Sequence, residues 1–425
     1  MKNGGPASAT VAVLLLACEP RVTFSEHIAP ILQAKCESCH RPGQMAPMSL
    51  RSYAETRPLA PVIRASVAIG NMPPFYADGP PGYYKNDIRL TDREKKLIIE
   101  WADSGAPEGD PDLLPSPVEW DDSEWPFGEP DLVLHFPAHS PPADNREHWI
   151  TFFADQAFPE NIWARAIHLK TSSRKTVHHS TLFTVGPRSK IPKNRKTRRH
   201  VAPAPGLFTW FPGLVIDPLP EGQAIQLRSP RRIAARTHFA PTNKRRTEQM
   251  EVGIYFATGV VERVQKKLTW QFTKQLKIPP GASDFTLSGT RGFTEAAEIT
   301  HFKVHMHLRG KSSRIILHYP DGSKQTVFDL PRYRFNWQRY YYLAEPLLVP
   351  KGTVAEFVGV WDNSAANPSN PNPRAWCSWG RRTTDEMFGA AIFYTPQNKL
   401  LKPLHIENGR AVEKAPPEVL EMPLG

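Results

Sequence analysis

Residues 304–310 read VHMHLRG, and the alternation of residue types in this stretch is the pattern that dominates the last two thirds of the chain. A period of two predicts a β-strand whose successive side chains point to opposite faces. His305 and His307 would then share one face, with Met306 on the other. His301 lies four residues before His305, so three of the 15 histidines fall within seven residues. The stretch therefore predicts a strand that presents two imidazoles side by side.

Segments with the same period surround this stretch. They are short, rich in β-branched and aromatic residues, and separated by turn sequences such as PDG. About 270 residues of such strands predict two tandem all-β sandwich domains of jelly-roll-like architecture. We expect these domains at 131–262 and 263–400, with a seam in ATGVVERVQKKL (257–268) and a C-terminal tail at 401–425. The segments are MEVGIYFATG (250–259), TWQFTKQLKIP (269–279), SRIILHYPDGSKQTVFDL (313–330) and GAAIFYT (389–395).

Length, composition and charge limit the class of protein. The chain has 425 residues, which argues for several domains, and 44 prolines, which argue for many turns. Residues 116–130, rich in proline and acidic side chains, predict a linker. The net charge is +11, with basic runs at 188–200 and 228–238. Because no nucleic-acid-binding motif accompanies these runs, we expect solvated loops and no nucleic-acid partner.

The N-terminal sequence MKNGGPASATVAVLLLACEP combines one lysine with a short apolar run that ends in LLAC. The run is shorter than the ~18 apolar residues of a membrane-spanning helix and is typical of a signal peptide. LLAC also resembles a bacterial lipobox, in which Cys18 would be lipidated; the alternative is a plain signal peptide with an incidental cysteine. We therefore expect residues 1–18 to be a signal peptide and the protein to be an exported bacterial lipoprotein, anchored to the membrane on its periplasmic side.

The sequence KCESCHRPG contains Cys36-x-x-Cys39-His40. This spacing is the attachment signature of haem c, in which two thiols bond to the porphyrin and the adjacent imidazole binds the iron. A zinc or thiol-redox site is the alternative, but the chain has no second cysteine pair, and such a site leaves His40 unexplained. Cys377 then has no expected disulfide partner. We expect one covalently bound haem c.

Two helical patterns flank this motif and predict a small all-α cytochrome c domain over residues 20–115. SEHIAPILQAKC (25–36) has apolar residues at helical spacing after Ser25, the expected cap. In LTDREKKLIIEWADSGAP, Thr91 and Glu94 have the spacing of a capping box, and a glycine and a proline follow the last turn. These two helices are the ones expected to cross over the haem.

The second axial ligand of the haem iron is expected to be Met72, in the sequence AIGNMPPF (68–75). A thioether ligand raises the haem potential and suits electron transfer. Met45 and Met48 are alternatives, but they lie very close to His40 along the chain. With both axial positions filled, the haem would carry electrons and would not bind oxygen.

The β-rich part holds further histidines in short motifs. TVHHSTLF has adjacent His178 and His179, which point to opposite faces of a regular strand, so they share a metal only where the strand bends or ends. Three ligands in each half predict two mononuclear metal sites. Imidazoles suit Zn, Cu, Ni or Fe, while a thioether favours copper. The expected sets are His178, His179 and His238 in the first half, and His305, His307 and Met387 in the second.

With these motifs, residues 130–400 resemble the copper type II, ascorbate-dependent monooxygenases, the family of the peptidylglycine α-hydroxylating and dopamine β-hydroxylating enzymes of animals. HHSTLF, THFAPTNK, VHMHLRGK and DEMFGAAIFY occur in the family's order and approximate spacing. The resemblance implies two β-sandwiches, each with one copper ion, that face each other across an open cleft. It implies an electron-transfer copper at His178, His179 and His238, and a catalytic, oxygen-binding copper at His305, His307 and Met387.

The chain departs from the family at the positions that hold the substrate of the peptide-amidating member. There, an arginine two residues before the first catalytic-site histidine, and an asparagine and a tyrosine after the methionine ligand, bind the substrate carboxylate. Those positions are Lys303, Gly389 and Ala391 here. A lysine keeps the charge but not the bidentate fork of an arginine. The animal enzymes are also held by disulfides, for which this chain has only Cys377 to spare. We therefore do not expect a C-terminal glycine peptide as the substrate.

Together these patterns predict an exported copper-dependent monooxygenase that hydroxylates a C–H bond of an unidentified organic substrate with O2. Its cofactors would be two copper ions and one haem c. Electrons from an external donor, either ascorbate-like or a redox protein, would pass through the haem. Two other classes stay open: a haem–copper protein that transfers or stores electrons without oxygenating anything, and a zinc hydrolase.

Overall fold

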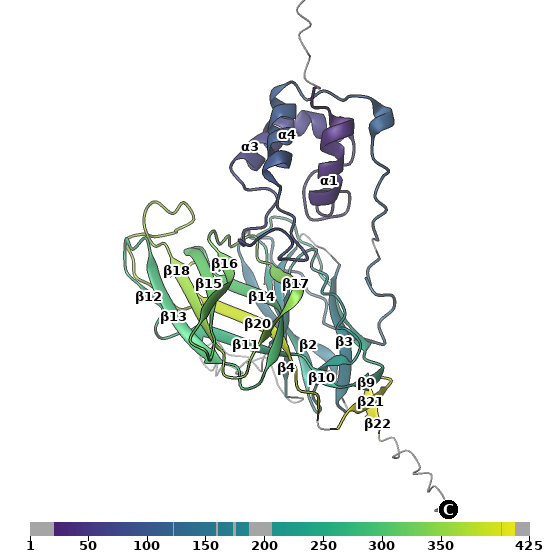
Figure 1. The fold of residues 1–425 in the computed structure, drawn as a ribbon, viewed down its shortest axis with the longest axis vertical. Coiled ribbons are helices and arrows are strands. Elements are labelled where there is room, and N and C mark those ends of the chain that lie inside the picture. The colour runs from purple at the N-terminus through teal and green to yellow at the C-terminus, as the bar shows by residue number, and fades with distance from the viewer. Residues whose placement is uncertain are drawn as a thin grey trace, which may run out of the picture. The chain divides into compact units, whose positions relative to one another are not determined.

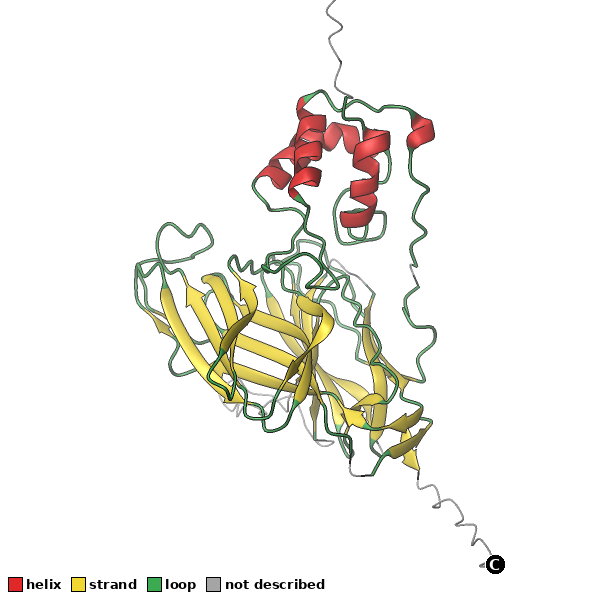
Figure 2. Cartoon of the chain, in the orientation of Figure 1, coloured by secondary structure: helices red, strands yellow, loops and turns green. Residues whose placement is uncertain are grey.

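The computed structural model describes residues 21–412 except 122, 159, 173–175, 187–205 and 401. The expected signal peptide, Cys18 and the basic run 188–200 lie outside the described residues. Helices occur only in the N-terminal part of the described chain, and strands make up the rest (Figure 2). None of the helices in this described part is long and apolar enough to cross a membrane.

The chain divides into two compact units, whose elements are labelled in Figure 1. The helical unit comprises residues up to Pro42, then Met48–Pro73 and Leu90–Val118. The β unit comprises Gly43–Pro47, Pro74–Arg89 and the chain from Glu119 onward. The chain therefore passes from one unit to the other five times before the first strand begins. The helical elements are η1 (Phe24–Ile28), α1 (Ala29–Lys35), α2 (Tyr53–Thr56), η2 (Arg57–Leu59), α3 (Ala60–Ala68), α4 (Asp92–Asp103) and η3 (Pro111–Leu113).

The start of α4 has the capping box that its sequence predicts. The Thr91 hydroxyl accepts the backbone N–H of Glu94, and the Glu94 carboxylate accepts the backbone N–H of Thr91. Ile98 and Trp101 are buried on one face of this helix. Gly105 follows with a φ of 90°, a conformation that glycine adopts without strain and that ends the helix.

The expected cap at Ser25 is wrong. The first helix already begins at Phe24, after Thr23 in extended conformation. Phe24 is buried against Tyr53 and Trp101, with ring centroids 5.4 and 6.0 Å away. This packing favours a helix that starts at Phe24, before Ser25. Ser25 is buried as well, and its hydroxyl donates to the carbonyl of Glu108 instead of capping a helix.

The first sandwich of the β unit packs two sheets around one apolar core. One sheet has the order β1-β8-β3-β6-β10 and the other β2-β7-β4-β5. The run 228–238, expected as a solvated loop, instead supplies most of β7, because Ile233, Ala234 and Ala235 are fully buried between its arginines. The strands are β1 (Leu132–His135), β2 (His148–Ala157), β3 (Ile162–Thr171), β4 (Val177–Val185), β5 (Gly206–Trp210), β6 (Gln223–Leu227), β7 (Arg232–Phe239), β8 (Met250–Phe256) and β10 (Arg263–Val264).

The second sandwich has sheets of order β11-β20-β14-β17 and β13-β18-β15-β16. Within the segment 257–268, β10 pairs with β6 of the first sandwich and β11 pairs with β20 of the second. Part of the expected tail forms a small sheet, β22-β21-β9. The strands are β9 (Gly259–Val261), β11 (Lys266–Phe272), β12 (Lys277–Ile278), β13 (Phe285–Gly292), β14 (Ala297–Met306), β15 (Gly310–His318), β16 (Lys324–Leu330), β17 (Tyr340–Val349), β18 (Val354–Trp361), β19 (Cys377–Ser378), β20 (Phe388–Pro396), β21 (Leu404–Glu407) and β22 (Arg410–Val412).

Residues 74–89, which we call the return segment, lie between two helices in sequence but pack in the second sandwich. The segment forms isolated bridges to Asp329 and Leu343, at strands β16 and β17. The aromatic side chains of the segment explain this placement. Each Å² of apolar surface removed from water stabilises the folded state by roughly 25 cal/mol. The side chains that join the sandwich core are Phe75, Tyr76, Ala77 and Tyr84.

We predict that Phe75→Ala destabilises the β unit although residue 75 lies between two helices in sequence. Phe75 is 4% exposed and packs edge-on against Tyr341 at 5.1 Å, and removal of such a ring costs about 3–5 kcal/mol. Hydrogen exchange of the β17 amides should accelerate. Val62→Ala, at an exposed position of α3, is the control and should leave that exchange unchanged. Equal β17 protection in both variants would contradict the assignment.

Candidate metal centres

The first histidine set is assembled by a β-bulge. Strands β4 and β7 pair with Val177 opposite Phe239 and His179 opposite His238, and the register shifts between residues 177 and 179. The bulge at His178 breaks the strict alternation of faces, so both adjacent imidazoles reach one place. One ring nitrogen each from His178, His179 and His238 lies within 4.8 Å of the others. Three imidazole nitrogens at this spacing suit one metal ion.

The surroundings of His238 are the strongest indication that this set binds a ligand. Its side chain is 2% exposed, and neither ring nitrogen has a hydrogen-bond partner among the described residues. A buried polar group without a partner costs ~1–3 kcal/mol. Trp149, directly opposite on β2, stacks on the imidazole at 4.1 Å with an interplanar angle of 7°. The ring is therefore held in place while its nitrogens are left for a ligand.

Burial keeps the imidazoles of His178 and His179 in the neutral form that binds metals. Desolvation, followed by the charge of His238, lowers the pKa of His178 to about 4. Desolvation and then His305 lower the pKa of His179 well below its usual range. Neutral imidazoles offer a lone pair without first losing a proton, so the site is prepared for a cation at neutral pH.

The second set lies where β14 ends. His305 and His307 have ring centroids 5.2 Å apart, while Met306 between them is fully buried in the core on the other face. His305 Nδ1 lies 2.6 Å from Gln338 Oε1, and His307 Nδ1 lies 3.2 Å from the carbonyl oxygen of Asp385. Each contact requires an N–H on Nδ1, so Nε2 of both rings is the nitrogen with a free lone pair.

Strand pairing brings Met387 to the same set. His305 lies directly opposite Gly389 in the β14–β20 ladder, and opposite residues share a face. Met387, two residues before Gly389, therefore shares the face of His305 and His307, at the end of the ladder beside His307. Its side chain is half-buried.

A buried carboxylate, Glu386, ties the backbones of these ligands together. Its oxygens accept backbone N–H groups from His307 at 3.0 Å, Arg309 at 2.6 Å and Met387 at 3.0 Å. Trp361 Nε1 donates a fourth hydrogen bond, at 3.1 Å. Burial raises the pKa of Glu386 to about 7, against the pull of these donors. The residue fixes the position of His307 relative to Met387.

The two sets are close neighbours. The rings of His179 and His305 have centroids 6.0 Å apart. Phe335 lies between the sets as well, 5.5 Å from His178 and 5.9 Å from His307. The resemblance implies an open cleft between two sandwiches; in this structure the rings of His179 and His305 are in contact, and Phe335 contacts both sets.

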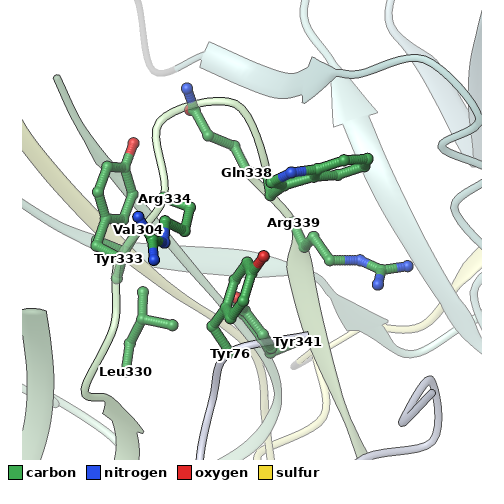
Figure 3. Close-up of a pocket in the computed structure, with 9 residues that line it drawn as sticks. Tyr76, Val304, Leu330, Tyr333, Arg334, Gln338, Arg339 and Tyr341 are labelled. Carbon is green, nitrogen blue, oxygen red and sulfur yellow. The ribbon is translucent and has the colours of Figure 1, made fainter. Parts of the chain in front are cut away.

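Phe335 and Gln338 belong to the loop 331–339. The same loop contacts the return segment. Figure 3 shows Tyr76 of that segment in one pocket with Gln338 and Arg339. The Arg339 side chain donates to the Pro74 carbonyl at 3.2 Å. The loop that orients His305 is thus held by the return segment.

Two residues near the sets lie outside them. His301 shares the face of His305 but stacks on Phe393 at 4.1 Å, with its Nδ1 2.9 Å from the Thr300 hydroxyl. Lys303 donates to the Thr209 hydroxyl at 2.5 Å, and burial lowers its pKa to about 7. With its ammonium already engaged, Lys303 does not present a free charge for a substrate.

In the helical unit, the haem motif forms one tight turn. The backbone N–H groups of Cys39 and His40 both donate to the carbonyl of Cys36. All three side chains are partly exposed, and that of Cys36 packs against the apolar core of the unit. Burial raises the pKa of the Cys36 thiol to about 12. A cavity of about 310 Å³ beside α1 is lined by ten residues, none of which is Cys36, Cys39 or His40. They are Phe24, Ala29, Gln33, Glu37, Leu50, Arg51, Leu114, Pro115, Ser116 and Pro117.

The three methionines considered as axial ligand lie in different surroundings. Met72 is half-buried, and its backbone N–H donates to the carbonyl of Ser66 near the end of α3. Met48 packs against the same core as Cys36, and Met45 belongs to the segment that clusters with the β unit. Both Met72 and Met48 therefore belong to the helical unit.

Gln338, Glu386, Phe335 and Trp149 were not identified from the sequence. Glu386 had the best signal, as an acidic residue directly before the expected ligand Met387. The others act from strands and loops distant in sequence, and only the register of β2 with β7 and the course of the loop 331–339 reveal them.

Comparisons with known proteins give a likeness of fold at a low level. No protein-family model matches the chain, and no curated protein matches it. Among solved structures, the major capsid protein P2 of bacteriophage PM2 is 10% identical, with a TM-score of 0.22 over 63% of this chain and 99% of that one. A two-domain protein of unknown function from Bacteroides fragilis is 9% identical, with a TM-score of 0.18 over 61% of this chain and 94% of that one. Scores this low carry no argument about what the chain binds.

We predict that Glu386→Ala destabilises the protein strongly even without any metal. Four N–H donors lose their acceptor, and a buried unpaired donor costs ~1–3 kcal/mol. Urea denaturation of the metal-free protein should show the loss. Glu356→Gln, which removes a carboxylate paired with His318 at a less buried place, should cost below about 1 kcal/mol. A metal-free Glu386→Ala protein as stable as the wild type would refute this role.

Proposed function

We propose that the protein is an exported copper-dependent monooxygenase that hydroxylates a C–H bond of an organic substrate with O2. The observation that carries this proposal is the adjacency of two sets, one of three imidazoles and one of two imidazoles and a thioether, with His179 and His305 6.0 Å apart. The resemblance of the motifs to copper type II monooxygenases supports the same reading.

The donor atoms fit copper at both sets. Three imidazoles suit copper in either oxidation state, and the thioether of Met387 favours Cu(I) at the second set. Copper held there would supply one-electron redox chemistry and the activation of oxygen. The chain's own part is to orient the ligands. Gln338 and the Asp385 carbonyl hold His305 and His307 with Nε2 free, and Glu386 accepts the backbone N–H groups of His307 and Met387.

The helical unit would supply the electrons. Cys36, Cys39 and His40 lie on one turn beside an apolar core, a donor set that fits covalently bound haem. An external donor, ascorbate-like or a redox protein, would reduce the haem, and the first set would relay electrons to the second. Export and a lipid anchor at Cys18 rest on the sequence alone.

One observation favours a second candidate function, a haem–copper electron-transfer protein that does not oxygenate a substrate. Rings of the two sets are in contact with each other and with Phe335, and such packing suits electron exchange without an organic molecule between the sets. Oxygen uptake by the reduced protein, coupled one-to-one to an oxygenated product, distinguishes the two functions. Electron transfer without product would favour the second.

We predict two copper ions per chain, separable by mutation. His305→Ala and Met387→Ala should each bind fewer copper ions and lose oxygen uptake while the haem is still reduced. His178→Ala should slow turnover, because the relay of electrons fails. His301→Ala, outside both sets, should keep two copper ions. Metal analysis and oxygen electrodes measure these outcomes.

Removal of copper by a chelator should abolish oxygen uptake, and Cu should restore it while Zn should not. Full activity of Met387→Ala with two copper ions bound would exclude the assignment of the second set. Zinc at full occupancy without copper in the isolated protein would favour a hydrolase instead.

We predict covalently bound haem. Haem stain should survive a denaturing gel in the wild type and be lost in Cys36→Ala and Cys39→Ala. Met72→Ala should remove the thioether–iron charge-transfer band at the red end of the oxidised spectrum, and the matched variant Met48→Ala should keep it. The opposite result for these two variants would identify Met48 as the axial ligand, and an unstained wild type made with haem-attachment factors would disprove the cytochrome.

A further inference from the structure

Glu147 is an acidic side chain placed beside both metal sets, and neither the sequence motifs nor the proposed function gives it a role. It directly precedes β2, two residues before Trp149. Trp149 lies opposite His238 in the β2–β7 ladder, and residues two apart on a strand share a face. Glu147 therefore lies on the same face of the sheet as Trp149 and His238. Its side chain is 33% exposed, so its carboxylate is only partly solvated.

The carboxylate contacts residues of both sandwiches. Its Oε2 lies 3.6 Å from Nε2 of His238, a ligand of the first set. The same oxygen accepts a hydrogen bond of 2.8 Å from the hydroxyl of Thr383. Thr383 is 6% exposed and lies four residues before Met387, in the turn that leads to the second set. A glutamate side chain is negatively charged at neutral pH.

Glu147 also completes a pattern among the ligands. His305 and His307 each have one ring nitrogen engaged by an oxygen, from Gln338 and from the Asp385 carbonyl. His238 has no such hydrogen bond, and its Nε2 lies 3.6 Å from an oxygen of the Glu147 carboxylate. A separation of 3.6 Å needs a shift of roughly 0.6–0.8 Å to become a hydrogen bond. A metal ion on Nδ1 fixes the proton on Nε2 and so supplies the donor for that bond.

We propose that Glu147 is a positioning residue that accepts the Nε2–H of His238 and the hydroxyl of Thr383 together, and so couples the first metal site to the turn that carries Met387. The inference rests on the proposed function for the presence of metal at both sets. Its negative charge makes the imidazole of His238 a better donor to a cation and stabilises Cu(II) over Cu(I) at the first site. Its link to Thr383 joins the two sandwiches beside the metal sites.

The test compares Glu147→Gln, Glu147→Ala and Thr383→Val with the control Asp144→Asn in the full chain. Asp144 is an exposed carboxylate in the same loop that pairs with His148 and touches neither set. The readouts are copper content, Cu(II) affinity, the Cu(II) electron paramagnetic resonance spectrum and the reduction potential of the first site. Oxygen uptake is followed alongside, but it does not decide the outcome.

Glu147→Ala should lower the affinity of the first site for Cu(II) by about 10–100-fold, the range for loss of a hydrogen-bond partner of a metal ligand. Glu147→Gln keeps an acceptor oxygen but loses the charge, so it should keep two copper ions, change the resonance spectrum of the first site and raise its potential. Thr383→Val should leave the copper content unchanged and alter the spectrum of the first site. Asp144→Asn should match the wild type.

Two results would overturn the inference. Affinity, spectrum and potential unchanged in both Glu147 variants would show that the carboxylate has no effect on the site. Loss of one whole copper ion in Glu147→Gln would make Glu147 a ligand and not a positioning residue. A wild type that binds no copper defeats the proposed function itself, so the two failures are distinguishable.

Discussion

The antiparallel pairing of β14 with β20 is the constraint on which the rest of the β unit depends. It sets His305 opposite Gly389. This register determines which side chains of β20 and the residues just before it lie beside His305 and His307. A slip of one residue would turn Met387 into the core and bring Phe388 to the imidazoles. The full burial of Phe388 and Met306 in the core opposes such a slip, so the apolar pattern of both strands protects the geometry of the site.

Burial near the metal sets has two consequences that oppose each other. It keeps four imidazoles neutral, those of His178, His179, His305 and His307, so that their lone pairs are available. It also leaves buried polar atoms that need partners. At the second set, oxygen acceptors meet this need. Gln338 and the Asp385 carbonyl accept from the rings of His305 and His307, and the Glu386 carboxylate accepts the backbone N–H of His307. His238 is the exception among the described ligands, and that exception is the physical argument for a bound cation.

The sequence was informative where a feature depends on near neighbours. Periods of two predicted the strands around 250–259 and 313–330, the spacing of Thr91 and Glu94 predicted the start of α4, and the adjacency of His178 and His179 required the irregular strand that the bulge provides. The β-sandwich class followed from the same local signals. The cytochrome, copper and oxygenase assignments stay predictions.

Features that depend on distant partners were not predictable in this way. Ser25 was expected as a cap, but the burial of Phe24 by Tyr53 and Trp101 shifted the helix start. The run 228–238 was expected in solvent because of its arginines, yet three consecutive buried apolar residues, Ile233, Ala234 and Ala235, place it in a sheet. The closeness of the two metal sets depends on the packing of one sandwich on the other, for which no local pattern exists.

The return segment has a consequence for the order in which the chain can fold. The hydroxyl of Tyr83 donates to the carbonyl of Val327, 244 residues later, and the amide of Asn86 donates to Tyr340, 254 residues later. During synthesis the helices on either side of the segment are complete long before those partners exist, and contacts of such long range form slowly. The loop that follows Met72 thus stays open until the second sandwich has formed. The proposed haem attachment at Cys36 and Cys39 would have that interval in which to occur. A chain that begins at residue 119 would have to fold the second sandwich without Phe75, Tyr76, Ala77 and Tyr84 of its core.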